Sequence, residues 1–324
     1  MARRELGPAS LAVVQAVDGA LDQTDCALLV ACSGGPDSLA LAAGAWRVAG
    51  RRGLPAAAIV VDHGLQPDSS QVAARASGQL RAIGFREVVV EQVDVELTSG
   101  VGPEAAARAA RYQAFDAHAV RLGATTLLGH TLDDQAETVL LGLARGSGAR
   151  SLAGMAIRGA DYLRPLLQLR RTTTEAMCVE LGLDPWQDPH NADPRYARVR
   201  VRRNVLPVLE AELGPGIAEA LARTAALLGD DADLLEQLAA AADPGTEDLD
   251  CGLLAKLAPA LRRRVIRRWL LAGGAADVTR RHVLAVESLV LDWHGQQAVQ
   301  LSAADVVRRD GVLQLTARSV PTNS

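Results

Sequence analysis

Short apolar runs of strand length alternate with longer segments of helical period along most of the chain. The runs are mostly apolar, which predicts strands that are covered on both faces. Parallel strands need a crossover such as a helix between them, so this alternation predicts a doubly wound, mostly parallel α/β sheet. The predicted strands are residues 26–32, 57–61, 87–93, 125–129 and 162–167, and the predicted helices between them are 38–49, 68–83, 103–122 and 132–144.

The alternation ends near Leu213-Gly214-Pro215-Gly216, and from there to about residue 294 the sequence is rich in Ala and Leu, with helical period. We therefore predict an α/β domain at residues 1–214 and a smaller, mainly helical domain at residues 215–324. Three short runs near the end of the chain surround a turn at Asp310-Gly311, which predicts a terminal β-hairpin.

Composition excludes several classes of protein. No apolar run approaches the ~20 residues of a membrane span, and Met1 to Ser10 lacks the apolar core of a secretory signal, so we predict a soluble cytoplasmic protein with no membrane partner. A net charge of −4 argues against a generally basic nucleic-acid binder, so any binding of nucleic acid must come from local positive patches. Four scattered cysteines without a C-x-x-C pair favour reduced, mostly buried thiols over a zinc ribbon, an iron–sulfur site or disulfides: Cys26, Cys32, Cys178 and Cys251.

The turn after the first predicted strand reads Ser33-Gly34-Gly35-Pro36-Asp37-Ser38. Its glycines let backbone N–H groups approach an anion, and Pro36 suits the first position of a helix whose dipole favours phosphate. Ser33 and Ser38 add hydroxyl donors, and Asp37 is suited to help hold a Mg²⁺ ion that bridges phosphates. The lysine of a Walker loop and the spacing of a dinucleotide loop are absent. The turn predicts an ATP site, with a Gly-Gly turn that binds nothing as the alternative.

Polar residues follow two further predicted strands. Asp62 and His63 end the second strand, and His130 follows a later one. Ligands of open α/β sheets bind outside the carboxyl ends of the strands. We therefore expect these residues to converge on one crevice with the Ser33–Ser38 loop.

Two carboxylates, Asp134 and Glu137, lie three residues apart at the start of the helix predicted after His130. They share one face of that helix near its positively polarised end, where carboxylates stay ionised. Such a pair suits an ammonium group or a metal ion. Capping of the helix by Asp133 and Glu137 is the alternative.

Arginines supply nearly all of the positive charge, since Lys256 is the only lysine. On the 103–122 helix, Arg108 and Arg111 are candidates for bidentate recognition of an anion, with exposed Glu–Arg pairing as the alternative. A stretch of nine residues holds five arginines and no acid, which predicts a phosphate-contact patch or else a solvated helix face: Arg195, Arg198, Arg200, Arg202 and Arg203. A second cluster, between residues 262 and 268, is weaker because helical period splits it over two faces.

The Ser33–Ser38 loop resembles that of the PP-loop ATP pyrophosphatases, which implies cleavage of ATP between its α- and β-phosphates and adenylation of a second substrate. Within that group the chain is similar to the tRNA(Ile)-lysidine synthetases in their short form. The matching segments occur in the same order over the first ~215 residues, although His190 stands where a serine is commoner. They are Gly102 to Tyr112, Gly129 to Thr138, Arg145 to Gly148, Leu152 to Met155, Arg164 to Leu167, Trp186 to Asp188 and Asn191 to Pro207.

This resemblance implies a two-step reaction. The C2 oxygen of the wobble cytidine, position 34 of the isoleucine tRNA with a CAU anticodon, attacks the α-phosphate of ATP. The ε-amine of free L-lysine then displaces AMP from C2, which changes the codon read from AUG to AUA. On this interpretation residues 1–214 bind ATP and catalyse, and residues 215–324 contact the tRNA.

The implied roles can be given by residue. The Ser33–Ser38 loop, Asp62 and His63 bind ATP, and Asp37 also holds Mg²⁺. Asp134 and Glu137 capture and deprotonate lysine, with His130 as a minor member of the site. Arg108 and Arg111 contact the adenylate or the lysine carboxylate, and which one contacts which is open.

Other interpretations share the loop. A tRNA-thiolating PP-loop enzyme is the nearest, but it needs reactive cysteines, and we expect Cys26 and Cys32 inside a strand and Cys178 on a helix. An ammonia-using synthetase lacks the arginine stretch, and a nucleotide-sensing module releases no pyrophosphate. The sequence leaves the oligomeric state open, with a homodimer as one option. It also leaves open how the methionine tRNA is excluded.

Overall fold

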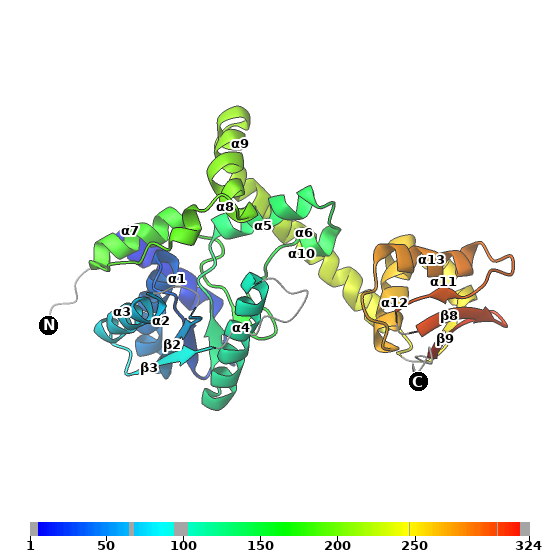
Figure 1. The fold of residues 1–324 in the computed structure, drawn as a ribbon, viewed down its shortest axis with the longest axis horizontal. Coiled ribbons are helices and arrows are strands. Elements are labelled where there is room, and N and C mark those ends of the chain that lie inside the picture. Colours follow the sequence, from blue (N-terminus) through cyan, green and yellow to red (C-terminus); the bar gives the residue numbers. More distant parts are fainter. Residues whose placement is uncertain (1–5, 65–67, 94–102, 246, 303, 318–324) are drawn as a thin grey trace. The chain divides into compact units, whose positions relative to one another are not determined.

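The computed structural model describes residues 6–64, 68–93, 103–245, 247–302 and 304–317, which form two compact units that divide between Leu228 and Gly229 (Figure 1). The sequence placed the domain boundary earlier, at residues 214 and 215. The difference arises at helix α10 (Ile217–Ala241), whose first turns bury Ala218 beside Ala136 of the N-terminal unit. Each unit is described by itself below.

The N-terminal unit contains the predicted parallel sheet. Its five strands run in the order β3-β2-β1-β4-β5, and every neighbouring pair is parallel. All five lie within or beside the predicted runs, which confirms the doubly wound α/β prediction. They are β1 (Leu28–Ala31), β2 (Ala56–Asp62), β3 (Glu87–Gln92), β4 (Thr125–Leu127) and β5 (Tyr162–Leu163).

Helices cover both faces of this sheet, as Figure 1 shows. One hydrophobic core joins Val30 and Val60 of the sheet to α1 (Pro8–Ala20), α2 (Pro36–Arg52), α3 (Ser69–Ile83) and α7 (Arg171–Leu181). A second core packs Phe115 of α4 (Pro103–Leu122) against Leu29 and Ile59 on the other face. The remaining elements of this unit are α5 (Leu132–Ala144), α6 (Ala149–Leu152), η1 (Pro189–Ala192), α8 (Ala197–Arg200), the π-helical η2 (Val201–Val205) and α9 (Leu206–Leu213).

The C-terminal unit combines helices with a small antiparallel sheet of order β6-β9-β8-β7. The β8–β9 hairpin lies where the sequence predicted one, and its turn residues Asp310 and Gly311 both have positive φ, 48° and 84°. Strand β6 was not predicted, because two residues carry no periodic signal. The elements are β6 (Leu249–Asp250), α11 (Cys251–Lys256), α12 (Pro259–Ala272), α13 (Arg280–Leu291), β7 (Val299–Gln300), β8 (Ala304–Arg309) and β9 (Val312–Ala317).

Most of the thiols are buried as predicted, but two of the cysteines lie outside the strand in which the sequence placed them. Cys32, Cys178 and Cys251 are buried, but Cys26 is exposed and precedes β1, so its placement inside a strand was wrong. Cys32 directly follows the same strand, so its placement inside the strand was also wrong. In the described part of the chain, no helix has both the length and the apolar character needed to cross a membrane.

Gly129, just after β4, lets that strand end lie directly against the Ser33–Ser38 loop. A Cβ atom at this position would lie 3.1 Å from the carbonyl oxygen of Asp37 and 3.2 Å from the Cα of Ser38. Backbone atoms cannot move aside as the end of a flexible side chain can. The absence of a side chain at Gly129 therefore sets how closely β4 approaches the loop.

We predict that Gly129→Ala lowers the free energy of unfolding by about 1–3 kcal/mol, the usual cost of overpacking. Gly78→Ala is the matched control, because Gly78 lies in helix α3 with nothing within 4 Å of the added Cβ. This control should raise the free energy of unfolding by about 0.5–1 kcal/mol. Chemical denaturation measures both, and equal effects of the two variants would contradict the close packing at Gly129.

Candidate active site

The Ser33–Ser38 loop joins β1 to α2 and is closed by its own serines. Gly34 has a φ of 83°, and Pro36 begins α2. The hydroxyl of Ser38 donates to the carbonyl of Gly35 at 2.9 Å and accepts from the backbone N–H of Ser33 at 3.2 Å. The loop is therefore ordered by internal hydrogen bonds, and it presents the N-terminus of a 17-residue helix, the arrangement that binds phosphate.

Arg171, the first residue of α7, joins this loop to α5. Its Nε lies 3.1 Å from Oδ2 of Asp37, and one terminal nitrogen lies 2.7 Å from Oδ1 of Asp134. The other terminal nitrogen lies 3.9 Å from Oε1 of Glu137. Although burial disfavours its charge, the carboxylates of Asp134 and Asp37 raise the pKa of Arg171. One guanidinium group therefore brings together the three acids that the sequence selected.

Arg202 is the second cation at this centre. Its guanidinium pairs with both oxygens of the fully buried Glu137 side chain, at 2.6 and 3.2 Å, and also lies 3.5 Å from Asp134. Arg202 belongs to η2, and π-helical turns of this kind often occur at functional sites. This arginine therefore turns away from the surface patch in which the sequence had placed it.

Asp134 also caps the helix that carries it. Its Oδ2 accepts hydrogen bonds from the backbone N–H and the hydroxyl of Thr131, at 2.8 and 2.9 Å. The capping alternative named Asp133 and Glu137, and for those residues it was wrong. Asp133 instead pairs with Arg170 and Glu137 pairs with Arg202.

The two carboxylates of α5 have different protonation properties. Burial raises the pKa of Glu137, and it outweighs the opposing effect of Arg202. Burial also acts to raise the pKa of Asp134, but Arg171 and the hydrogen bonds from Thr131 outweigh it, so this pKa is lowered. Asp134 is therefore the more firmly ionised of the two, and Glu137 is the better proton acceptor.

His63 and Arg111 form a pair between the end of β2 and α4. Two nitrogens of Arg111 lie 3.1 and 2.8 Å from Nε2 of His63. Burial and the charge of Arg111 lower the pKa of His63 to about 4, so this ring is neutral and accepts at Nε2. Asp62 is buried beside it and accepts from the backbone N–H of Gly64 at 3.0 Å.

Arg108 and His130 complete the set of predicted residues. Arg108 donates to the hydroxyl of Tyr112 at 3.0 Å, and its guanidinium lies 4.8 Å from the centre of that ring. Burial lowers the pKa of His130 to about 4, even though nearby Asp134 acts to raise it. Gly102, where the motif that contains Arg108 begins, lies outside the described residues.

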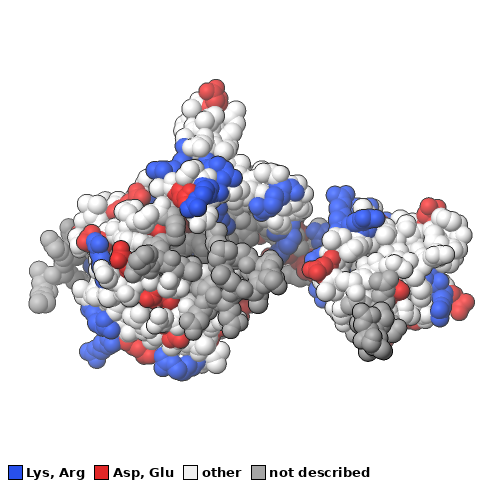
Figure 2. Space-filling model, in the orientation of Figure 1, with Lys and Arg blue, Asp and Glu red and all other residues white. Residues whose placement is uncertain are grey.

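The remaining arginines of the 195–203 stretch are exposed. Figure 2 shows Lys and Arg side chains gathered over α8, at the base of α9. Arg195 is paired with Asp193 at 2.6 Å. In the described structure, no acid pairs with the other three exposed arginines, which contact Thr138 or backbone carbonyls only: Arg198, Arg200 and Arg203.

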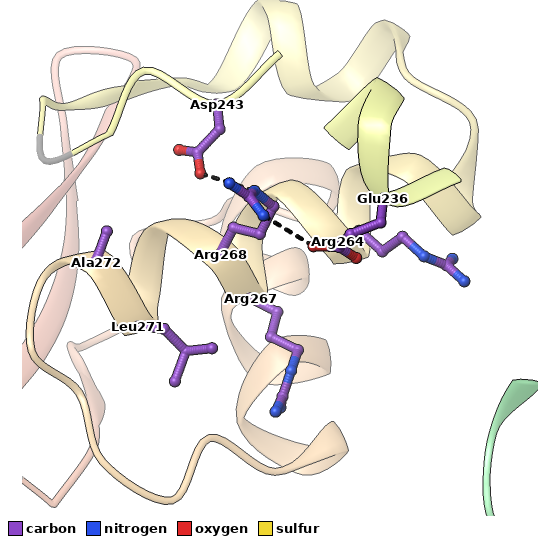
Figure 3. Close-up of a pocket in the computed structure, with 7 residues that line it drawn as sticks. All are labelled: Glu236, Asp243, Arg264, Arg267, Arg268, Leu271 and Ala272. Carbon is purple, nitrogen blue, oxygen red and sulfur yellow. Dashed lines mark hydrogen bonds and ion pairs between the residues drawn. The ribbon is translucent and has the colours of Figure 1, made fainter. Parts of the chain in front are cut away.

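Arginines of α12 line an open pocket in the C-terminal unit. Arg268 lies between Asp243 and Glu236, at 3.1 and 2.9 Å, whereas Arg264 and Arg267 extend away from these acids (Figure 3). Arg262, by contrast, is buried and bonded to Glu287 at 2.8 Å. This split over two faces agrees with the helical period read from the sequence.

Sequence reasoning did not identify Arg171 or Thr174. Thr174, one turn along α7, donates through its hydroxyl to Asp37. Neither residue lies at a strand end or in a glycine-rich turn, and their distance from Asp37 in sequence hides the contact. The one available signal was an Arg-Arg pair, residues 170 and 171, just after the Arg164 to Leu167 segment.

Mg²⁺ fits this donor set only in part. No group of three or more His, Cys, Asp or Glu side chains among the described residues could hold a metal ion. However, Mg²⁺ in nucleotide sites is commonly held by one or two carboxylates together with substrate phosphates. Asp37, on the loop itself, is the carboxylate that would hold the ion.

Comparison with solved structures supports the fold. The U34-tRNA thiolase NcsA from Methanococcus maripaludis, solved with its [4Fe-4S] cluster, superimposes with a TM-score of 0.55 at 18% sequence identity. The match covers 68% of this chain and 80% of that chain. At this low identity the likeness concerns the architecture alone.

Comparison of sequences identifies the family. Residues 11–209 match a model described as PP-loop domain, and residues 249–314 match one described as TilS substrate binding domain. The tRNA(Ile)-lysidine synthase of Leifsonia xyli is 55% identical over 295 residues, 88% of each chain. That of Thermobifida fusca is 53% identical over 298 residues, 90% of this chain and 91% of its own. This chain therefore belongs to the tRNA(Ile)-lysidine synthase family.

Proposed function

We propose that this chain ligates free L-lysine to C2 of the wobble cytidine of the CAU-anticodon isoleucine tRNA, with ATP as the activating substrate. AMP and pyrophosphate are the other products, and the tRNA then reads AUA instead of AUG. The observation that carries the proposal is the contact of Arg171 with Asp37 of the loop and with Asp134 of α5. This contact joins the loop that we assign to the phosphates of ATP to carboxylates that suit an ammonium group.

The first step needs stabilisation of charge on the leaving pyrophosphate. Backbone N–H groups of the Ser33–Ser38 loop, its hydroxyls and the N-terminus of α2 supply fixed dipoles for it. Mg²⁺ bound with ATP would supply further charge neutralisation, and Asp37 would hold it. Attack by the C2 oxygen of cytidine on the α-phosphate then forms the adenylated base and releases pyrophosphate.

The second step needs an uncharged amine. The ε-ammonium of lysine enters beside Asp134, which is firmly ionised and holds the positive charge. Glu137, whose pKa is raised, accepts a proton from it. The amine attacks C2, and the bond from C2 to the adenylated oxygen breaks, so that AMP leaves. Arg108 and Arg111 are assigned to the adenylate or the lysine carboxylate.

The tRNA contacts are assigned to arginines in both units. Arg198, Arg200 and Arg203 are exposed without acidic partners in the described part of the chain, as phosphate contacts require. In the C-terminal unit, Arg264 and Arg267 are the corresponding candidates. The target base must be unpaired and splayed out for its C2 to be reached.

A tRNA-thiolating reaction is disfavoured by the cysteines. Burial raises the pKa of Cys178 to about 11 and also raises that of Cys32. Such thiols are protonated near neutral pH and are poor nucleophiles. Cys26 is exposed, but the other three cysteines of the chain are buried, so Cys26 has no second exposed thiol to work with.

One assay tests the proposed function directly. The protein is incubated with ATP, Mg²⁺, labelled lysine and total tRNA, and label in RNA is measured together with pyrophosphate release. The proposal expects both, in equal amounts. Pyrophosphate release without labelled RNA would refute it.

We predict that Glu137→Gln slows lysine transfer by about 10²–10⁴-fold, the usual contribution of a general base. Adenylation, measured as pyrophosphate release in a single turnover without lysine, should be retained. Glu175→Gln, on an exposed face of α7, is the matched control and should transfer lysine at the wild-type rate. Wild-type transfer by a folded Glu137→Gln protein would contradict the assignment. Asp134 is less suitable for this test because it also caps α5.

A second prediction concerns tRNA affinity. Replacing Arg200 and Arg203 together by Gln should weaken binding and flatten the plot of log affinity against log salt concentration by about one to two in slope. Arg121→Gln is the control, because Arg121 is paired with Glu87 at the amino end of β3, away from the loop. Fluorescence anisotropy with the tRNA at several salt concentrations measures both. An unchanged slope in the double variant would show that these arginines contact no phosphate.

A further inference from the structure

Arg171 is bonded to a carboxylate oxygen that the lysine substrate of the proposed reaction also needs. Oδ2 of Asp134 is already bonded to Thr131, so Oδ1 is the oxygen left to accept from an ammonium group. In the structure, a terminal nitrogen of Arg171 lies 2.7 Å from that oxygen, and one of Arg202 lies farther from it, at 3.5 Å. The lysine ammonium and Arg171 therefore compete for the same acceptor.

ATP would change this competition. Arg171 is also bonded through Nε to Asp37, a residue of the loop on which the phosphates would lie. Guanidinium groups bind phosphate strongly and often through two nitrogens at once. Phosphates on the loop would therefore draw Arg171 toward them and away from Asp134.

The carboxylates do not depend on Arg171 for their orientation. Thr174 donates to Oδ1 of Asp37, and Thr131 donates twice to Oδ2 of Asp134. Both acids would keep their positions if Arg171 moved. Three carboxylates face two guanidinium groups here. The departure of Arg171 would remove one positive charge from beside α5, and the more negative site that remains would favour binding of a cation.

We propose that Arg171 is a positioning residue that makes lysine binding depend on ATP. In the free enzyme it holds Oδ1 of Asp134, and when ATP occupies the loop it shifts to the phosphates and leaves that oxygen to the lysine ammonium. The inference rests on the proposed function. Its consequence is that lysine binds productively only where an α-phosphate is available to activate the cytidine.

Isothermal titration calorimetry of L-lysine, with and without Mg²⁺ and α,β-methylene ATP, tests this coupling. For the wild-type protein the nucleotide should tighten lysine binding by about tenfold. Arg171→Lys keeps one charge but has a single nitrogen on a shorter reach, so it cannot hold both acids, and the coupling should fall below about twofold. Arg170→Lys is the matched control, since Arg170 pairs with Asp133 and Glu219 instead, and it should keep the tenfold effect. Equal coupling in the wild type and in Arg171→Lys would overturn the proposal.

A measurement on the wild type alone serves if Arg171→Lys does not fold. Adenosine, which has no phosphates, should leave the affinity for lysine unchanged, and an effect of adenosine equal to that of the analogue would refute the role of Arg171. Incorporation of labelled lysine into tRNA separates this inference from the proposed function. Incorporation with uncoupled lysine binding would reject only the inference, whereas no incorporation would reject the function.

Discussion

Three carboxylates lie within reach of one another where the Ser33–Ser38 loop meets α5, and they are mostly withdrawn from water. Such an arrangement is unfavourable unless cations lie among the acids, and Arg171 and Arg202 supply them. Removing one partner of a buried ion pair typically costs about 3–5 kcal/mol, whereas an exposed pair such as Arg75–Asp184 contributes about 0–1 kcal/mol. The buried centre, and not the surface pairs, therefore fixes how the loop, α5, α7 and η2 are placed.

The parallel sheet explains why these elements meet. All five strands of the N-terminal unit point the same way, so the loop after β1, Asp62 and His63 at the end of β2 and His130 after β4 lie at one edge. Gly129 then allows the end of β4 to touch the backbone of Asp37. Segments far apart in sequence are thereby brought into contact, and the Ser33–Ser38 loop lies next to the carboxylates of α5.

Much of the fold of the N-terminal unit could be predicted from the sequence, because the strands, helices and turns depend on local patterns. Apolar runs predicted the strands, and Gly34 and Pro36 marked a tight turn between a strand and a helix by backbone geometry alone. The contacts of Arg171 could not be predicted from the sequence. Arg171 and Asp37 are 134 residues apart, and no local spacing indicates that they meet. Arg202 was assigned to the surface because a high density of arginines does not show which way each side chain points. The π-helical turn that carries Arg202 toward Glu137 also leaves no periodic signal in the sequence.

In the proposed reaction, a base is first adenylated and then attacked by an amine at one site. The most direct measurement follows the α-phosphate of ATP in a single turnover with the isoleucine tRNA. We predict that label from the α-phosphate appears on the RNA in the absence of lysine and is released as AMP when lysine is added. AMP release at the same rate before lysine is added, with no labelled RNA at any time, would contradict it.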